Sequence, residues 1–207
     1  MDKTSVIFQE LFQRYPSLES CKNDIYNTFT AMSECFESGG KVLCCGNGGS
    51  AADCDHFAGE LLKGFLKKRP LSDCEKQKLG NGFIADNLQK GLPVISLCTH
   101  SALMTAFEND VVPALVFAQQ VYAYAQKGDV LFCLSTSGNS ENVVYAAQTA
   151  KASGIVSVAI TGKNESKLSE ICDICIRLPE TETFKIQELT LPVYHCIAAM
   201  IEEYFFE

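Results

Sequence analysis

The sequence predicts a doubly wound α/β fold, in which a parallel sheet of about five strands lies between two layers of helices. Short apolar runs, each followed by turn residues and then by helically spaced apolar positions, alternate along most of the 207 residues. Strands that are apolar throughout are typical of a parallel sheet covered on both faces. Strand–helix–strand connections of this length give right-handed crossovers, which build a three-layer sandwich.

The elements can be placed in order along a single domain of residues 1–207. Residues 18–36 carry apolar positions at helical spacing and stop before Gly39-Gly40, which predicts a long helix within an N-terminal helical region of residues 1–40. Strands are expected at 41–45, 92–98, 129–135, 155–161 and 171–178. The other helices are expected near 50–63, 101–107, 113–126, 140–153, 165–171 and 184–205.

Composition excludes several classes of protein. A net charge of −8, from 17 basic and 25 acidic residues, disfavours general binding to nucleic acid. No apolar stretch approaches the roughly 18 residues of a membrane span, and the N-terminus lacks the apolar core of a secretory signal.

The eleven cysteines fall mostly in apolar runs. They are expected to be buried side chains of a protein in the reducing cytoplasm, with no membrane partner.

Residues 63–91 interrupt the alternation of strands and helices. This segment holds seven basic and three acidic residues, a net charge of +4 within an acidic chain. An insertion exposed to solvent is the simpler interpretation. The alternative is an excursion over the active site, where the cations would help to retain an anionic ligand.

Two loops are candidates for ligand binding because each joins the carboxyl end of a strand to a helix, where doubly wound sheets bind ligands. Residues 46–50 read GNGGS, and their glycines let backbone amides at a helix N-terminus approach a ligand closely. Residues 135–140 read STSGNS. Ordinary helix capping accounts for only one or two such polar residues, so this run favours phosphate binding. The first loop also fits a dinucleotide fingerprint, but the acidic residue expected about 20 positions later is missing.

Two helices carry residues that could act in catalysis or bind a metal. His56 and Glu60 are four apart, share one helix face, and suit a metal or a proton-transfer pair, with a surface ion pair as the alternative. Gln187 and His195 are eight apart, about 12 Å along a helix axis. They can meet only at an atom midway between them or across a subunit boundary. A core histidine is the alternative for His195.

Five dispersed segments then occur in a specific order: GNGGSAADCDHFAGEL, END, LSTSGNSENV, ITGK and IQELTLPVYH. Together they resemble the phosphoheptose isomerase family, which are sedoheptulose 7-phosphate isomerases with a sugar isomerase (SIS) domain of flavodoxin-like fold. The resemblance runs from about residue 18 to the C-terminus, apart from residues 63–91. It implies that the sugar phosphate is bound by Asn47, Gly48, Gly49, Ser50, Asn109, Asp110, Ser135, Thr136, Ser137, Ser140 and Gln187.

The resemblance also implies a cofactor, an assembly and a mechanism. One Zn²⁺ per subunit would be held by His56, Glu60, Gln187 and His195. The protein would be a homotetramer with active sites at subunit interfaces and its N-terminal helices in a central bundle. Glu60 would be the base and His195 the acid in isomerisation to a manno-heptose 7-phosphate through an enediol or enediolate, in a route to lipopolysaccharide precursors. Zn²⁺ could polarise the carbonyl.

Two departures from the family leave the substrate open. Residues 63–91 are longer than the usual segment there, and Phe184 stands where the family commonly has an Asp three residues before its Gln. One alternative is therefore an isomerase of another sugar phosphate. The other is a non-catalytic SIS module that binds a phosphosugar or another protein. A chain that holds both Glu60 and His195 is more consistent with an enzyme.

Overall fold

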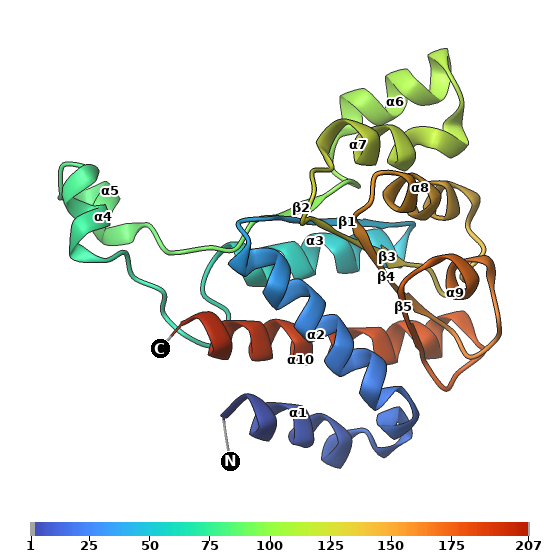
Figure 1. Cartoon of the computed structure of the whole chain (residues 1–207), viewed down its shortest axis with the longest axis horizontal. Coiled ribbons are helices and arrows are strands. Elements are labelled where there is room, and N and C mark those ends of the chain that lie inside the picture. The colour runs from blue at the N-terminus through green and yellow to red at the C-terminus, as the bar shows by residue number, and fades with distance from the viewer. Residues whose placement is uncertain (1–2, 207) are drawn as a thin grey trace.

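The computed structural model describes residues 3–206 and confirms the predicted doubly wound α/β fold (Figure 1). All strand pairs are parallel, and the strands lie in the order β2-β1-β3-β4-β5. The chain winds outward in opposite directions from β1, so the topological switch point lies between β1 and β3. The strands are β1 (Val42–Gly46), β2 (Val94–Ser96), β3 (Val130–Leu134), β4 (Val156–Thr161) and β5 (Ile174–Arg177).

Alternate residues of the strands enter two separate cores. On β1, Val42 and Cys44 pack into one core, whereas Leu43 and Cys45 pack into the other. The first core is covered by α2 (Lys22–Glu37), α3 (Gly49–Leu62) and α10 (Thr183–Phe205). Helices on the other face are α6 (Ser101–Asp110), the 3₁₀ helix η2 (Pro113–Leu115), α7 (Val116–Tyr124), α8 (Glu141–Ala152) and α9 (Lys167–Ile171). This is the three-layer arrangement expected from the sequence.

The N-terminal region is helical, as predicted, and consists of two α-helices joined by a short 3₁₀ helix. Residues Lys3–Arg14 form α1, Pro16–Cys21 form the 3₁₀ helix η1, and α2 follows directly. Pro16 lacks a backbone N–H and is tolerated only at the first turn of a helix, so α1 ends before it. The 18–36 helix expected from spacing therefore begins later, at Lys22. α1 packs on the outer side of α10 (Figure 1).

The cysteines are mostly core residues. Seven of the eleven are buried, and all eleven are free thiols, including Cys172 and Cys175 of the CxxC sequence. Cys74 is the exposed exception, and it lies in the segment of residues 63–91. Among residues 3–206, no helix is both long enough and apolar enough to cross a membrane, although α10 has 23 residues.

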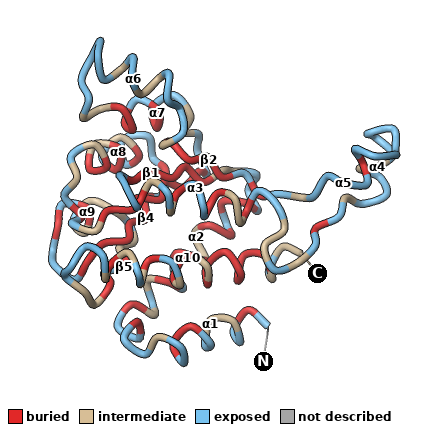
Figure 2. Tube along the Cα trace, turned by 180° about the vertical axis from the view of Figure 1, so that it is seen from behind, coloured by how far each residue is buried: buried red, intermediate tan, exposed pale blue. Residues whose placement is uncertain are grey.

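Residues 63–91 form an arm that projects from the body of the molecule (Figures 1 and 2). Its two short helices are α4 (Asp73–Lys78) and α5 (Phe83–Asn87). Ala85 is the one buried residue between 70 and 91, whereas Phe83 is 83% and Ile84 61% exposed. The arm extends from the end of α3, on the opposite side of the molecule from the start of that helix (Figure 1). Within one chain it does not cover the loops that follow β1 and β3.

The root of the arm is fixed by a buried ion pair. Arg69 has no exposed side-chain surface and donates from Nε to Oε1 of Glu202 on α10, at 2.8 Å. The guanidinium also donates to the carbonyl oxygens of Glu60 and Leu61, which end α3. The Glu202 carboxylate accepts the backbone N–H groups of residues 65–67. Arg69 is thus a structural residue, unlike the solvated cations expected in this segment.

Replacing Glu202 with Ala should lower the free energy of unfolding by about 3–5 kcal/mol, because the Arg69 charge stays buried without its partner. Chemical denaturation measures this loss. The exposed pair of Lys76 with Asp86 offers a matched control, and Lys76→Ala should change stability by about 0–1 kcal/mol. An equally small loss for Glu202→Ala would contradict the structural role of the ion pair.

Candidate active site

The loop between β1 and α3 lies at the switch point of the sheet. Gly48 adopts φ of +56°, a conformation that favours glycine, and α3 begins at Gly49. The side chain of Asn47 exchanges two hydrogen bonds of 2.9 Å with that of Asn142, in the first turn of α8. This pair joins the loops that follow β1 and β3. Asn142 was not predicted as a site residue, because its pairing depends on the adjacent ends of two strands.

The serine hydroxyl groups of residues 135–140 bond within their own loop, where Oγ of Ser137 accepts the backbone N–H of Asn139. Ser140 precedes α8, but its side chain makes no capping hydrogen bond; its Oγ instead accepts from the Oγ of Ser135 at 3.1 Å. Ser135 is buried, whereas Ser137 is exposed. Thr136, Ser137 and Lys163 line a cavity of about 340 Å³, which also contains Glu165 and Glu180. Lys163 belongs to the ITGK segment and is the cation that could help to hold a phosphate there.

Gln187 lies beside the first loop. A Cβ atom on residue 49 would come within 2.5 Å of Nε2 of Gln187, so the end of this side chain from α10 lies directly against the start of α3. Gly49 and His56 are seven residues apart on α3, about 10 Å along its axis. In one chain Gln187 is thus placed with the predicted substrate loop, and its role as a metal ligand stays a prediction.

Three of the four predicted metal ligands meet where α3 crosses α10. His56 Nε2 lies 2.9 Å from Oε1 of Glu60, as their i,i+4 spacing on α3 requires. His195 joins them from α10, with its ring centroid 5.0 Å from that of His56. One ligand atom from each of the three residues lies within 4.8 Å of the others. We call His56, Glu60 and His195 the His–Glu–His cluster.

A buried tyrosine lies within hydrogen-bond distance of one histidine of this cluster. The Tyr194 hydroxyl lies 2.9 Å from Nδ1 of His56 and 3.3 Å from Oδ1 of Asp53. Tyr194 itself has no exposed surface. Burial raises the pKa of the Asp53 carboxyl, and the hydrogen bond from Tyr194 acts in the opposite direction. The sequence analysis missed Tyr194 and Asp53. Asp53 is three residues before His56 and shares its face, but Tyr194 becomes visible only once α10 is docked.

His195 contributes an unpaired nitrogen. Its Nε2 is buried and has no hydrogen-bond partner among residues 3–206. Burial lowers the pKa of the His195 imidazole, and the nearby His56 lowers it further. His195 also borders a cavity of about 210 Å³, which α1 closes with Arg14 and Leu11.

The His–Glu–His cluster fits a metal ion by its chemistry. Two imidazoles and one carboxylate are a donor set that catalytic zinc sites use. A buried imidazole nitrogen without a partner is a group that a bound cation would satisfy. Tyr194 provides His56 with the outer hydrogen bond that metal-bound histidines typically have.

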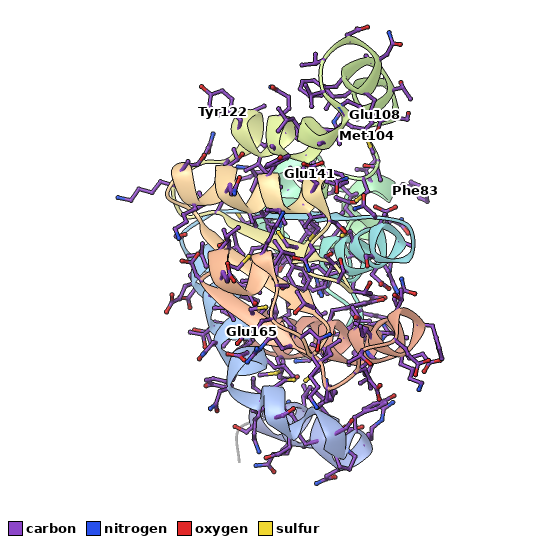
Figure 3. The ribbon with its side chains drawn as sticks, turned by 90° about the vertical axis from the view of Figure 1, so that its right-hand side faces the viewer. Phe83, Met104, Glu108, Tyr122, Glu141 and Glu165 are labelled. Atoms are coloured by element: carbon purple, nitrogen blue, oxygen red, sulfur yellow. The ribbon has the colours of Figure 1, made fainter. Side chains whose placement is uncertain are left out.

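The remaining predicted residues are not brought to this cluster within one chain. Gly49 and Glu60 are eleven residues apart on α3, about 16 Å along the axis, so the two loops lie far from the His–Glu–His cluster. Asn109 and Asp110 are exposed at the end of α6, in the helical layer on the opposite face of the sheet. Their neighbour Glu108 is at the outer edge of the molecule (Figure 3). One chain therefore holds three separate groups of candidate residues.

Similarity to known proteins covers nearly the whole chain. The SIS domain family matches residues 9–75 and 96–200, and the stretch between the two matches lies mostly in the arm. A phosphoheptose isomerase from Rhodospirillum rubrum is 37% identical over 186 residues, which are 90% of this chain and 88% of that protein. One from Nitratiruptor is 36% identical over 203 residues, covering 96% and 98% of the two chains.

Solved structures agree with these relatives. A phosphoheptose isomerase from Francisella tularensis superposes with a TM-score of 0.77 at 30% identity, over 97% of this chain and 96% of that one. One from Neisseria gonorrhoeae has a TM-score of 0.75 at 29% identity, over 97% of both chains. Fold, sequence and the order of the site segments lead to one assignment: the chain belongs to the phosphoheptose isomerase family of SIS-domain proteins.

Proposed function

We propose that this protein is an aldose–ketose isomerase that converts sedoheptulose 7-phosphate into a manno-heptose 7-phosphate. The relatives that it resembles over most of their length are named phosphoheptose isomerases. The observation that carries the proposal is the His–Glu–His cluster, which places a carboxylate beside two imidazoles at the crossing of α3 and α10. A purely structural SIS module has no need of such a group.

The reaction moves a proton between two neighbouring carbons through an enediol or enediolate. Glu60 has 14% of its side chain exposed, so it can reach a ligand while water is largely excluded. In the proposed mechanism its carboxylate takes the proton from one carbon and returns it to the next. His195 acts as the acid: it gives a proton to the carbonyl oxygen as the enediol forms and takes up the proton of the neighbouring hydroxyl as the new carbonyl forms.

The sugar phosphate is held at the switch point of the sheet. We assign the phosphate to the loop containing Ser135, Thr136, Ser137 and Ser140, and assign Ser50 to the start of α3 beside it. Asn47, Gly48, Gly49 and Gln187 lie close enough to this loop to bind the sugar. Asn109 and Asp110, which are exposed elsewhere on the surface, are the remaining residues that we assign to substrate binding.

A zinc ion, one per subunit, is the metal that we propose for the His–Glu–His cluster, with Gln187 as the expected fourth ligand. When bound, it would polarise the substrate carbonyl and stabilise negative charge on oxygen. Glu60 cannot be a tight ligand and a free base at the same moment. Its carboxylate is therefore proposed to bind the metal in some states and to exchange protons in others.

We propose that the site is completed in a homotetramer. In one chain Gly49, where the first loop enters α3, and Glu60 are separated by about 16 Å along the helix axis. The phosphate loop of one subunit and the His–Glu–His cluster of another would then face the same sugar. Residues 1–40 would form a central helical bundle, and the exposed Phe83 and Ile84 of the arm offer further apolar surface to a neighbour.

The reaction would take place in the cytoplasm, where the eleven free thiols stay reduced. A heptose phosphate produced there would be a precursor of lipopolysaccharide. Recovery of the protein from an extracellular fraction, rather than from the cytoplasm, would contradict this location.

Glu60→Gln should lower the rate of conversion of sedoheptulose 7-phosphate by about 10²- to 10⁴-fold, because the amide cannot accept the carbon-bound proton. NMR in D₂O measures product formation and the exchange of that proton for deuterium. Glu170→Gln, an exposed residue of α9 outside the candidate site, is the control and should retain the exchange. Full exchange in Glu60→Gln would remove Glu60 as the base.

A panel of phosphorylated ketoses assayed in the same way tests the substrate. Sedoheptulose 7-phosphate should have the highest kcat/KM. A higher value for another sugar phosphate would assign the chain to that substrate, and no turnover with any of them would favour a binding module.

Ser137→Ala and Ser140→Ala should each raise KM about tenfold with little change in kcat, because the phosphate is bound equally in the ground and transition states. Steady-state kinetics measures both constants, and Ser153→Ala, beyond the end of α8, is the control. A fall in kcat at constant KM would show that these hydroxyls act in the chemical step instead.

Native mass spectrometry tests the assembly and the metal together. The expected particle contains four chains and four zinc ions. Removal of the metal with a chelator should slow turnover, and added Zn²⁺ should restore it. Unchanged turnover in metal-free protein would exclude a catalytic role for zinc, whereas a stable monomer would contradict a site shared between subunits.

A further inference from the structure

We propose that Tyr194 and Asp53 are positioning residues, which determine the nitrogen of His56 that carries the proton. In this arrangement Nδ1 is protonated, and Nε2 presents its lone pair to the His–Glu–His cluster. The inference rests on the proposed function, since it concerns the capacity of that cluster to hold a divalent cation.

The geometry brings three polar groups into one row. Asp53 and His56 are three residues apart on α3, so they lie on the same face of the helix. Tyr194 reaches them from α10 and places its hydroxyl oxygen between Oδ1 of Asp53, at 3.3 Å, and Nδ1 of His56, at 2.9 Å. Burial of the whole Tyr194 side chain keeps water from competing for these bonds.

Counting protons leaves two arrangements. A neutral imidazole has one N–H, a phenol has one O–H, and an ionised carboxylate only accepts. In the first arrangement Tyr194 donates to Asp53 and accepts from Nδ1–H of His56, so the lone pair of Nε2 faces Oε1 of Glu60 and the two atoms need a cation between them. In the second, Tyr194 donates to Nδ1, and Nε2–H donates to Glu60, whose Oε1 is 2.9 Å away.

Asp53 favours the first arrangement. A hydroxyl donating to a carboxylate forms a charge-assisted hydrogen bond, about twice as strong as a neutral one. Among residues 3–206, Tyr194 is the one hydrogen-bond donor to the half-buried Asp53 side chain, so the second arrangement would leave that carboxylate with water alone. The first arrangement is also the one compatible with a cation, because a protonated Nε2 cannot be a ligand.

The hydroxyl of Tyr194 is not needed to fill space. Its ring contacts the rings of Phe57 and His195, with centroids at 6.2 and 5.0 Å, and a phenylalanine ring would make the same contacts. The hydroxyl has hydrogen-bond contacts with Asp53 and His56 alone in the part of the chain that the structure describes. Tyr194→Phe therefore separates positioning of His56 from packing.

The chain provides a matched control. Tyr124 also places its hydroxyl 2.9 Å from a histidine nitrogen, Nε2 of His100, but this pair is exposed and lies on the other face of the sheet. Tyr124→Phe removes the same hydrogen bond from an unrelated site.

The test measures Co²⁺ affinity by calorimetry in the intact, metal-depleted protein, together with the ¹⁵N chemical shifts of His56. Tyr194→Phe should weaken Co²⁺ binding about 10- to 100-fold, and the Nδ1–H signature of His56 should diminish. Tyr124→Phe should match the wild type in both measurements. Asp53→Asn, which keeps its shape but can donate, should weaken binding in the same direction and serves if Tyr194→Phe does not fold.

The proposal would be overturned if a folded Tyr194→Phe or Asp53→Asn protein bound Co²⁺ within about twofold of the wild-type affinity and its His56 chemical shifts were unchanged. A wild-type protein that binds no Co²⁺ would overturn it as well. Failure of the proposed function gives a different result: no turnover of any sugar phosphate, with Co²⁺ binding still dependent on Tyr194.

Discussion

The packing of α3 against α10 is the contact on which the candidate active site depends. It places His195 and Tyr194 of α10 against His56 and Glu60 of α3. The same packing is stabilised near the end of α3. There the Arg69 guanidinium donates hydrogen bonds to a carbonyl group in the last turn of that helix and to the Glu202 carboxylate of α10. Buried charges of this kind stabilise a structure only when each keeps its partner, so the two helices cannot separate at low cost.

The sheet provides the other half of the site by a different principle. Parallel strands β1 and β3 end side by side, with Gly46 opposite Leu134. The loops that follow them therefore meet, and the paired side chains of Asn47 and Asn142 join them. Glycines and hydroxyls at the starts of two helices are suited to bind an anion without a dense cluster of cations, which accords with the acidic composition of the chain.

The arm, residues 63–91, is the part of the chain that projects from the sandwich (Figure 1). At its root the side chain of Arg69 is fully buried, whereas its tip exposes Phe83 and Ile84. A segment that is anchored at its root and apolar at its tip is suited to contact a neighbouring protein surface.

Sequence alone determined the fold class, the strands and the local pairs. A continuous apolar run predicted β3 to within one residue at each end. The i,i+4 spacing of His56 and Glu60 predicted their contact. Both signals come from residues that are neighbours in the chain. Tertiary structure alone decided the burial of Arg69, the direction of the arm, the place of Gln187 and the contact of Tyr194 with His56. Those features join residues separated by up to 138 positions, and only the packing of one helix on another brings such residues together.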